Sequence, residues 1–107
     1  MNETKRKRRN DRMHIVYQLI NTVTLEQYIG IAAMIDRSGK ETLAARWSRH
    51  VGRAFNQNKS WKLCESIRAH GPESFHVEIV EKVRGKATAF ALETELRKSG
   101  KFTLNSV

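Results

Sequence analysis

The segment His14-Ile-Val-Tyr-Gln-Leu-Ile-Asn-Thr-Val-Thr-Leu-Glu-Gln-Tyr-Ile-Gly30 sets the architecture that the rest of this chain follows. It contains two runs rich in β-branched and aromatic residues, at 14–20 and 25–30, which flank a short polar link at 21–24. Residues of these types favour strands, and two such runs around a short link are typical of an antiparallel hairpin. The sequence therefore predicts a β-hairpin near the start of its folded part.

Each run of this hairpin carries one tyrosine, Tyr17 in the first and Tyr28 in the second. A loop of two or four residues would place the two tyrosines directly opposite each other on one face of the ribbon. Gly30 closes the second run, and its missing Cβ lets another backbone or a ligand come close. On the hairpin alone, the sequence favours an aromatic pair in a small core over a functional role for the two phenols.

The charge of the chain is strongly positive. In 107 residues there are 20 Lys and Arg against 11 Asp and Glu, which gives a formal net charge of +9. The excess is present in residues 1–12, with six basic and two acidic side chains, and again in 13–107, with fourteen and nine. This balance favours a polyanionic partner, nucleic acid rather than a membrane, because neither end of the chain forms a basic amphipathic helix. Colloidal solubility alone is the alternative explanation.

Cys64 is the only cysteine, which excludes an intrachain disulfide framework and a multi-cysteine zinc site. Its apolar helical surroundings predict a small core residue. The sequence contains no apolar run long enough for a membrane span, and its polar start lacks the apolar region of a signal peptide. We therefore expect a reducing, nucleic-acid-bearing compartment.

The chain divides by composition into an arm and a domain. Residues 1–12 have no apolar periodicity and are predicted to form a disordered basic arm, whereas 13–107 have the size of one domain. The arm could hold phosphates electrostatically. Its candidate phosphate contacts are Lys5, Arg6, Lys7, Arg8 and Arg9.

After the hairpin, Ile31–Lys40 is predicted to be a linker that leads into a helix over roughly 39–56. Ser38 and Glu41 have the spacing of a capping box at the start of this helix. A row of apolar residues at every fourth position predicts its buried face, and this row is Leu43, Trp47, Val51 and Phe55. A second row borders the first and can reach either a cleft or solvent; it consists of Arg46, His50 and Arg53.

The second half of the chain adds two helices and one strand. A helix is predicted up to about His70, where Gly71-Pro72 ends it. A strand follows over 74–83, and a last helix over 86–99. The predicted order β-β-α-α-β-α corresponds to an α+β fold with a small three-stranded antiparallel sheet flanked by helices.

The last helix carries a carboxylate with two explanations. Glu93 lies beside Leu92 near the core boundary, whereas Glu95 should point into solvent. An i, i+4 ion pair of Glu93 with Arg97 is a common surface feature. A lone carboxylate can also bind one Mg²⁺, which uses one or two protein carboxylates together with waters and substrate phosphate oxygens. His50 likewise has two explanations. It is either a general base or an ordinary histidine that is hydrogen-bonded in the fold or exposed to solvent.

An ordered series of these residues resembles the GIY-YIG nuclease family. The series is Tyr17, Tyr28-Ile29-Gly30, Arg46, His50, Leu92-Glu93 and Asn105. Trp47 lies between the arginine and the histidine, and residues 67–75 are similar to the helix-Gly-Phe-strand passage of that family. The resemblance spans about residues 14–106, and the β-β-α-α-β-α order read from periodicity agrees with the family's fold.

The chain departs from the family pattern at two places. The first motif is Ile15-Val16-Tyr17 instead of Gly-Ile-Tyr, which keeps the tyrosine and changes the backbone before it. Fifteen residues separate Gly30 from Arg46, so the Ile31–Lys40 linker is a candidate substrate-contacting or dimer-forming loop. The resemblance covers no second DNA-binding domain, so specificity would come from this domain, the arm, a homodimer or a protein partner.

The resemblance implies a metal-dependent DNA endonuclease that leaves 5′-phosphate and 3′-hydroxyl ends. Its catalytic residues would be Tyr17, Tyr28, Arg46, His50, Glu93 and Asn105, with Gly30 structural at the site. Glu93 would hold one Mg²⁺ or Mn²⁺ ion, and Arg46 would clamp the phosphate. Tyr17 would orient or deprotonate the attacking water, with His50 as an assisting or competing base.

The resemblance also implies DNA as the partner, with Arg53, Lys59 and Lys62 as further phosphate contacts. By analogy with small stand-alone members, it suggests a phage or mobile-element enzyme in the cytoplasm of a prokaryotic or infected cell. Two other functions remain open from the sequence alone. One is a basic DNA- or RNA-binding module that does not cut, and the other is an interaction protein whose charge is only colloidal.

Overall fold

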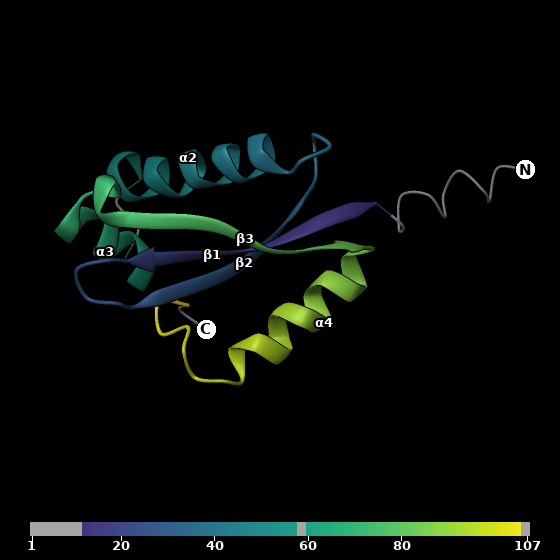
Figure 1. Ribbon diagram of the computed structural model, residues 1–107. Helices are drawn as coiled ribbons and strands as arrows, with labels where there is room; N and C mark the ends of the chain where they lie inside the picture. The colour runs from purple at the N-terminus through teal and green to yellow at the C-terminus, as the bar shows by residue number, and fades with distance from the viewer. Residues whose placement is uncertain (1–11, 58–59, 106–107) are drawn as a thin grey trace, which may run out of the picture.

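A computed structural model of the protein describes residues 12–57 and 60–105. The elements along the chain are β1 (Met13–Asn21), β2 (Gln27–Ala33), α2 (Lys40–Asn56), α3 (Lys62–His70), a short 3₁₀ turn η1 (Pro72–Ser74), β3 (Phe75–Arg84) and α4 (Lys86–Arg97). The strands form one antiparallel sheet in the order β2-β1-β3. Figure 1 shows α2 and α3 over one face of the sheet and α4 under the other. The predicted fold class and element order are confirmed.

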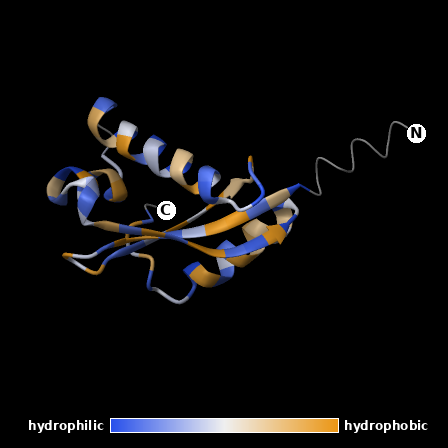
Figure 2. Ribbon diagram, turned by 45° about the horizontal axis from the view of Figure 1, so that its top comes forward, coloured by the Kyte–Doolittle hydropathy of each residue, from blue (hydrophilic) through white to orange (hydrophobic). Residues whose placement is uncertain are grey.

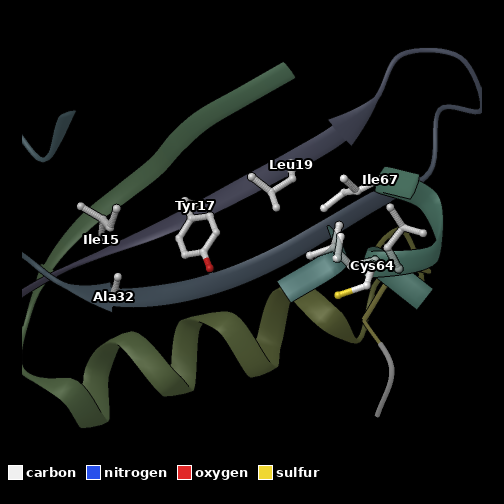
Figure 3. Close-up of a cluster of buried hydrophobic side chains, with 9 residues drawn as sticks. Ile15, Tyr17, Leu19, Ala32, Cys64 and Ile67 are labelled. Atoms are coloured by element: carbon white, nitrogen blue, oxygen red, sulfur yellow. The ribbon is translucent and has the colours of Figure 1, made fainter. Parts of the chain in front are cut away.

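The central strand β1 is buried on both faces. Ile15, Tyr17 and Leu19 belong to a core cluster on the α2 and α3 side, which Figure 3 shows in close-up. Val16 packs with Ala89 and other residues in a second, smaller cluster under α4. Figure 2 shows short hydrophobic segments along the strands, interrupted by hydrophilic residues, and a similar alternation along α2. Alternate side chains point to opposite faces of a strand, so the consecutive apolar residues Ile15 and Val16 supply both clusters.

The hairpin forms as predicted, but its register differs from the predicted one. Tyr17 pairs with Gly30, and Tyr28 pairs with Leu19. The prediction that both tyrosines lie on one face is confirmed, because residues two apart on a strand share a face. The prediction that they lie directly opposite each other is wrong, and the space over Gly30 is taken by Tyr17.

The loop of the hairpin explains this register. The Asn21 side chain accepts hydrogen bonds at Oδ1 from the backbone N–H groups of Val23 and Thr24, at 2.9 and 3.2 Å. Leu25 adopts a left-handed conformation with φ of 68°, and its N–H donates to the Asn21 carbonyl at 2.7 Å. An Asx turn of this kind fixes where the strands separate. Four residues, 22–25, therefore form the loop. It lies one position later than the predicted link at 21–24, and this shift pairs Tyr17 with Gly30 instead of Tyr28.

The predicted linker is shorter than expected because β2 continues through residues 31–33, which pair with 14–16. The start of α2 is held mainly by Asp36 and not by a Ser38–Glu41 capping box. The Asp36 carboxylate accepts hydrogen bonds from the backbone N–H groups of Glu41 and Thr42 at 3.1 and 3.0 Å, whereas Ser38 Oγ accepts only that of Lys40. The Thr42 hydroxyl, together with these amides, holds the pKa of Asp36 well below its ordinary value.

The predicted buried face of α2 is only partly correct. Leu43 and Trp47 pack against the main core cluster, but Phe55 is 52% exposed. A step of four residues turns a helix by about 400°, so a row at this spacing drifts by about 40° per step and leaves the core. The buried residues of α2 are instead Thr42, His50 and Ala54.

The end of α3 and the character of Cys64 agree with the predictions. Cys64 and Ile67 are fully buried in the main cluster. Gly71, with φ of 83°, ends the helix, and its N–H donates to the Ile67 carbonyl at 2.8 Å. Trp61 precedes the helix and is 44% exposed.

β3 contains a bulge that the sequence analysis did not predict. Val16 pairs with Glu81 and Tyr17 with Ile79, so Val80 has no partner on β1. A bulge of one residue exchanges the two faces of a strand. Consequently Ile79 packs in the main cluster and Val83 in the cluster under α4. The last helix, α4, ends at Arg97, two residues before the predicted end.

The predicted basic arm lies almost wholly in residues 1–11, outside the described residues, so the arm and the domain division at residue 12 stay predictions. In the part of the chain that the structure describes, no helix combines the length and the apolar character that crossing a membrane requires.

Candidate active site

All six predicted catalytic residues line one hollow of about 520 Å³, which is called the first hollow below. They are Tyr17, Tyr28, Arg46, His50, Glu93 and Asn105, and Gly30 and Arg53 line it as well. The residues come from β1, β2, α2, α4 and the tail after α4. Because α2 and α4 cover opposite faces of the sheet, their side chains can meet only around an edge. That edge is β2, the outer strand.

Tyr17 is at the bottom of the first hollow and is only 2% exposed. Its hydroxyl lies 2.9 Å from Nε2 of His50. A Cβ on Gly30 would lie 2.6 Å from the Tyr17 hydroxyl oxygen, so the tyrosine occupies the space that the glycine leaves. Figure 3 shows the Tyr17 hydroxyl directed over β2. Gly30 therefore determines where this oxygen lies.

Tyr28 and His50 complete a cluster of three rings. The centroids of Tyr17 and Tyr28 are 6.3 Å apart, and the Tyr28 and His50 rings meet edge to face at 5.2 Å and 71°. Edge-to-face contacts at this separation are a preferred aromatic geometry. The three rings therefore restrict one another's orientation, which keeps the Tyr17–His50 hydrogen bond in place.

Burial dominates the protonation of these rings. It raises the pKa of Tyr17 well above its ordinary value of 10, with Tyr28 adding to the rise and Arg46 opposing it. Burial also raises the pKa of Tyr28. Burial, and then the positive charge of Arg53 and other arginines, lowers the pKa of His50 to about 4. At neutral pH both phenols are protonated, and His50 is neutral and keeps one ring nitrogen as an acceptor.

The depressed pKa of His50 predicts a pH-dependent stability. An unfolded histidine titrates near 6.5, so between pH 6.5 and 4 the unfolded chain binds a proton that folded His50 does not. We expect this group to lower the free energy of unfolding as pH falls through that window, by on the order of 3 kcal/mol at pH 4. Denaturant unfolding at a series of pH values measures the slope.

His50→Gln should remove this part of the slope, and His76→Gln serves as the matched control. His76 is exposed, and its Nε2 lies 2.8 Å from Oε1 of Glu78, whose side chain is partly exposed. Equal slopes for the His50→Gln variant and the wild type would contradict a buried neutral His50.

Glu93 lies close to the first hollow and is only 7% exposed, whereas Glu95 is exposed, as predicted. Arg97 donates a hydrogen bond from Nη1 to Oε2 of Glu93 at 3.3 Å. The i, i+4 ion pair that the sequence left open is therefore present. It does not exclude a second role, because a carboxylate offers two oxygens and Arg97 also lines the hollow.

Asn105 binds the outer edge of β2. Its Oδ1 accepts a hydrogen bond from the Ile29 N–H at 3.0 Å, and its Nδ2 donates to the Ile29 carbonyl at 2.9 Å. Leu104 adds a backbone hydrogen bond to the Gln27 carbonyl at 2.9 Å. The tail thus pairs with the strand that carries Tyr28 and Gly30, and Asn105 fixes the position of that strand.

The predicted phosphate contacts have mixed outcomes. Arg53 lines the first hollow, and its guanidinium lies 5.7 Å from the centre of the Trp61 ring. Lys62 is exposed at the start of α3 and is not among the residues that line the hollow, although its neighbours Trp61 and Leu63 are. Lys59 and the basic residues at 5–9 lie outside the described residues.

Phe90 lines the first hollow and was not predicted as a site residue. It is 59% exposed, although it is a large apolar side chain. Phe90 precedes Glu93 by three positions on α4, and residues at this spacing share a helix face. The spacing of three residues between Phe90 and Glu93 could therefore have predicted from the sequence that Phe90 lines the same site.

The donor set of the first hollow suits a cation that is bound largely by non-protein oxygens. Across residues 12–57 and 60–105, no three His, Cys, Asp or Glu side chains are grouped so that they could hold a metal ion. Glu93 provides the carboxylate that lines the hollow. Mg²⁺ and similar ions commonly bind one or two carboxylates and complete their shell with waters and phosphate oxygens. Glu93 as the protein ligand fits this pattern.

No protein-family model and no curated protein matches the chain. Among solved structures, the catalytic domain of homing endonuclease I-TevI is similar, with a TM-score of 0.63 and 26% identity over 80% of this chain and 86% of that chain. A second structure is a mutant of the catalytic domain of intron endonuclease I-TevI in which one glutamate is alanine. It matches with a TM-score of 0.58 and 25% identity over 83% of this chain and 89% of its own. This similarity supports a nuclease. Since I-TevI is a GIY-YIG homing endonuclease, the chain has a GIY-YIG nuclease-like fold.

Proposed function

We propose that this chain is a metal-dependent DNA endonuclease that hydrolyses phosphodiester bonds and leaves 5′-phosphate and 3′-hydroxyl ends. The observation that carries the proposal is the convergence of six side chains on one hollow, in a fold shared with an endonuclease catalytic domain. They are Tyr17, Tyr28, Arg46, His50, Glu93 and Asn105. The net charge of +9 suits DNA, a polyanionic substrate.

Tyr17 and His50 act together as the base. In the tautomer that carries its proton on Nδ1, His50 accepts the Tyr17 hydroxyl proton at Nε2, across 2.9 Å. The attacking water passes a proton to the Tyr17 oxygen while the Tyr17 proton moves to Nε2. This relay avoids a free phenolate, which the raised pKa of Tyr17 makes scarce at neutral pH. Tyr17 contacts the water, and His50 receives the proton. The pKa of about 4 makes His50 a weak acceptor in the free protein, and the negative charge of a bound phosphate, which offsets the nearby arginines, raises that pKa.

Arg46 binds a non-bridging oxygen of the phosphate. Its planar guanidinium can donate two parallel hydrogen bonds, and its charge stabilises the negative charge that develops during attack. The water oxygen forms a bond to phosphorus while the bond to the 3′-oxygen breaks, and the departing 3′-oxygen takes a proton from solvent. Tyr28 positions Tyr17, and Asn105 holds the strand beneath both.

Glu93 is the residue that would hold Mg²⁺ or Mn²⁺, one ion per site. When bound, such an ion supplies positive charge to the phosphate and to the departing oxygen. The ion pair of Glu93 with Arg97 orients the carboxylate on α4 and leaves its second oxygen for the cation.

Plasmid nicking separates this proposal from a module that binds without cutting. Supercoiled plasmid is incubated with the protein and Mg²⁺, and in parallel with excess EDTA. An endonuclease converts the plasmid to open-circular or linear DNA with Mg²⁺ and leaves it intact with EDTA. A binding module only retards the DNA in both reactions, and a protein with merely colloidal charge does neither. Ligation of the products, with and without prior phosphatase treatment, identifies a 5′-phosphate.

Tyr17→Phe is expected to lower the cleavage rate by about a hundredfold, on the scale of losing one general base. The phenyl ring keeps the packing over Gly30, so thermal unfolding should change little, apart from the lost hydrogen bond to His50. Single-turnover nicking rates measure the effect. A Tyr17→Phe variant that cleaves at the wild-type rate would exclude the relay.

A further inference from the structure

A second hollow, of about 760 Å³, adjoins the first. The two hollows share Ile31, Arg46 and Phe90. The first is lined by β2 from Tyr28 to Ile31, and the second by β2 from Ile31 to Ala33. The second hollow therefore continues the candidate active site along the same strand edge, and a ligand in one can extend into the other.

The second hollow is positively charged. Arg12, Arg46 and Lys86 line it, and none of the described residues around it is acidic. Lys86 is exposed at the first position of α4, where the N-terminal amides add partial positive charge. In the sequence, Arg12 also follows closely on the five basic residues at 5–9. The charge pattern of this surface suits an anion.

Arg12 is held at the rim of this hollow by both its backbone and its side chain. Its carbonyl accepts hydrogen bonds from the Gly85 N–H and from Nδ1 of His14, each at 2.8 Å. Its guanidinium donates from Nη2 to the Met34 carbonyl at 3.1 Å. A guanidinium has five N–H donors, so this contact orients the group and leaves others for an anion.

Phe90 stands between the two hollows as an exposed aromatic side chain. Proteins that bind single-stranded nucleic acid combine such rings with cationic side chains, because unpaired bases stack on the ring while cations hold the phosphates. Phe90 and Arg46 both line the first and the second hollow, so the ring and this cation are available to the same ligand.

We propose that the second hollow binds the nucleotide next to the scissile phosphate on the same DNA strand. Arg12 and Lys86 hold its phosphate, Phe90 contacts its base, and Arg46 lies between the two phosphates. This inference rests on the proposed function, because it places the scissile phosphate in the first hollow.

The salt dependence of DNA binding tests the charged part of the proposal without any need for cleavage. We expect Lys86→Gln to reduce the slope of log affinity against log salt by about 0.9, the value for one lost phosphate contact on duplex DNA. Lys82→Gln is the matched control, because Lys82 is also exposed but lies on β3, the opposite edge of the sheet. Fluorescence anisotropy of a labelled duplex between low and physiological salt gives both slopes. Equal slopes for the two variants would overturn the proposal.

The aromatic part has its own readout. Phe90→Ala should weaken DNA binding by about tenfold without changing the salt slope, and Phe90→Trp should retain the affinity. If Phe90→Ala binds DNA with wild-type affinity, Phe90 does not contact the bound nucleotide.

The position next to the cleaved bond is tested with a neutral phosphate. Once the cleavage position is mapped, a methylphosphonate replaces the phosphate on one side of it or on the other. For one of the two substrates, Lys86→Gln should cause no further loss of binding. Additive losses with both substrates would contradict adjacency. If wild-type protein fails to nick plasmid while Lys86→Gln still lowers the slope, the proposed function is wrong and the anion site stands.

Discussion

Glu93→Gln should reduce DNA cleavage by at least about a hundredfold, the scale of losing one group that stabilises developing charge. The amide has almost the same shape as the carboxylate but no charge, so it is a poor ligand for Mg²⁺. Binding of DNA should persist or become slightly tighter, because a negative charge is lost beside a basic hollow. Single-turnover nicking with saturating Mg²⁺, together with anisotropy measurements of binding, gives both quantities.

Two further variants separate a metal-binding role of Glu93 from its ion pair. Arg97→Gln breaks the 3.3 Å pair and leaves the carboxylate in place, so cleavage should fall far less than in Glu93→Gln. Glu95→Gln removes an exposed carboxylate two residues away, which contacts Lys98 at 3.6 Å, and should behave as wild type. If Arg97→Gln and Glu93→Gln lose the same activity and the same stability, Glu93 is only half of an ion pair.

Gly30→Ala is expected to damage both stability and cleavage. The added Cβ would lie 2.6 Å from the Tyr17 hydroxyl oxygen and 2.7 Å from the ring carbon that carries it, closer than packed atoms allow. Overpacking of this kind costs roughly 1–3 kcal/mol. Tyr17 is buried and hydrogen-bonded to His50, so the clash is relieved only by moving the hydroxyl oxygen that is proposed to contact the attacking water. A displacement of about 1 Å can cost a hundredfold in rate.

Gly52→Ala provides the matched control for this change. Gly52 lies within α2, and the nearest atom to a Cβ there is the Asn56 side-chain nitrogen at 3.8 Å, an ordinary contact. Alanine is preferred over glycine inside a helix by about 0.5–1 kcal/mol, so this variant should unfold at a higher temperature and cleave normally. Thermal unfolding and nicking rates of both variants measure the contrast. Normal cleavage by Gly30→Ala would show that Tyr17 is not positioned through this glycine.

The fold could be predicted from local patterns in the sequence, whereas the six candidate catalytic residues, which line one hollow, were implied by the resemblance to the GIY-YIG nuclease family. Alternating apolar residues marked the strands, and Gly71-Pro72 marked the end of α3. The convergence of Arg46 and Glu93 on one hollow follows from the fold once β2 is known to be an edge strand.

The errors arose where a distant contact or a single backbone angle decides the structure. The pairing of Tyr17 with Gly30 depends on the Asn21 Asx turn and on the left-handed Leu25, which strand propensity does not encode. The exposure of Phe55 depends on where α2 turns away from the sheet.

The protonation states of Tyr17 and His50 could not be predicted from the sequence, because they depend on how deeply each side chain is buried. A histidine with an unperturbed pKa near 6.5 would be a good base at neutral pH, but burial in the fold lowers the pKa of His50 to about 4. The raised pKa of Tyr17 likewise follows from its burial, which outweighs the nearby arginines. The second hollow combines residues that are distant in sequence, such as Arg12, Arg46 and Lys86. No short sequence motif could therefore predict it.

The contacts of the tail with β2 have a consequence for self-association. An outer strand presents unpaired N–H and C=O groups that can recruit a strand from another molecule, which leads to aggregation. Asn105 occupies both polar groups of Ile29, and Leu104 occupies the carbonyl of Gln27. Leu104 and Asn105, which hold β2 in place beside the first hollow, therefore also block intermolecular β-pairing at this part of the sheet edge.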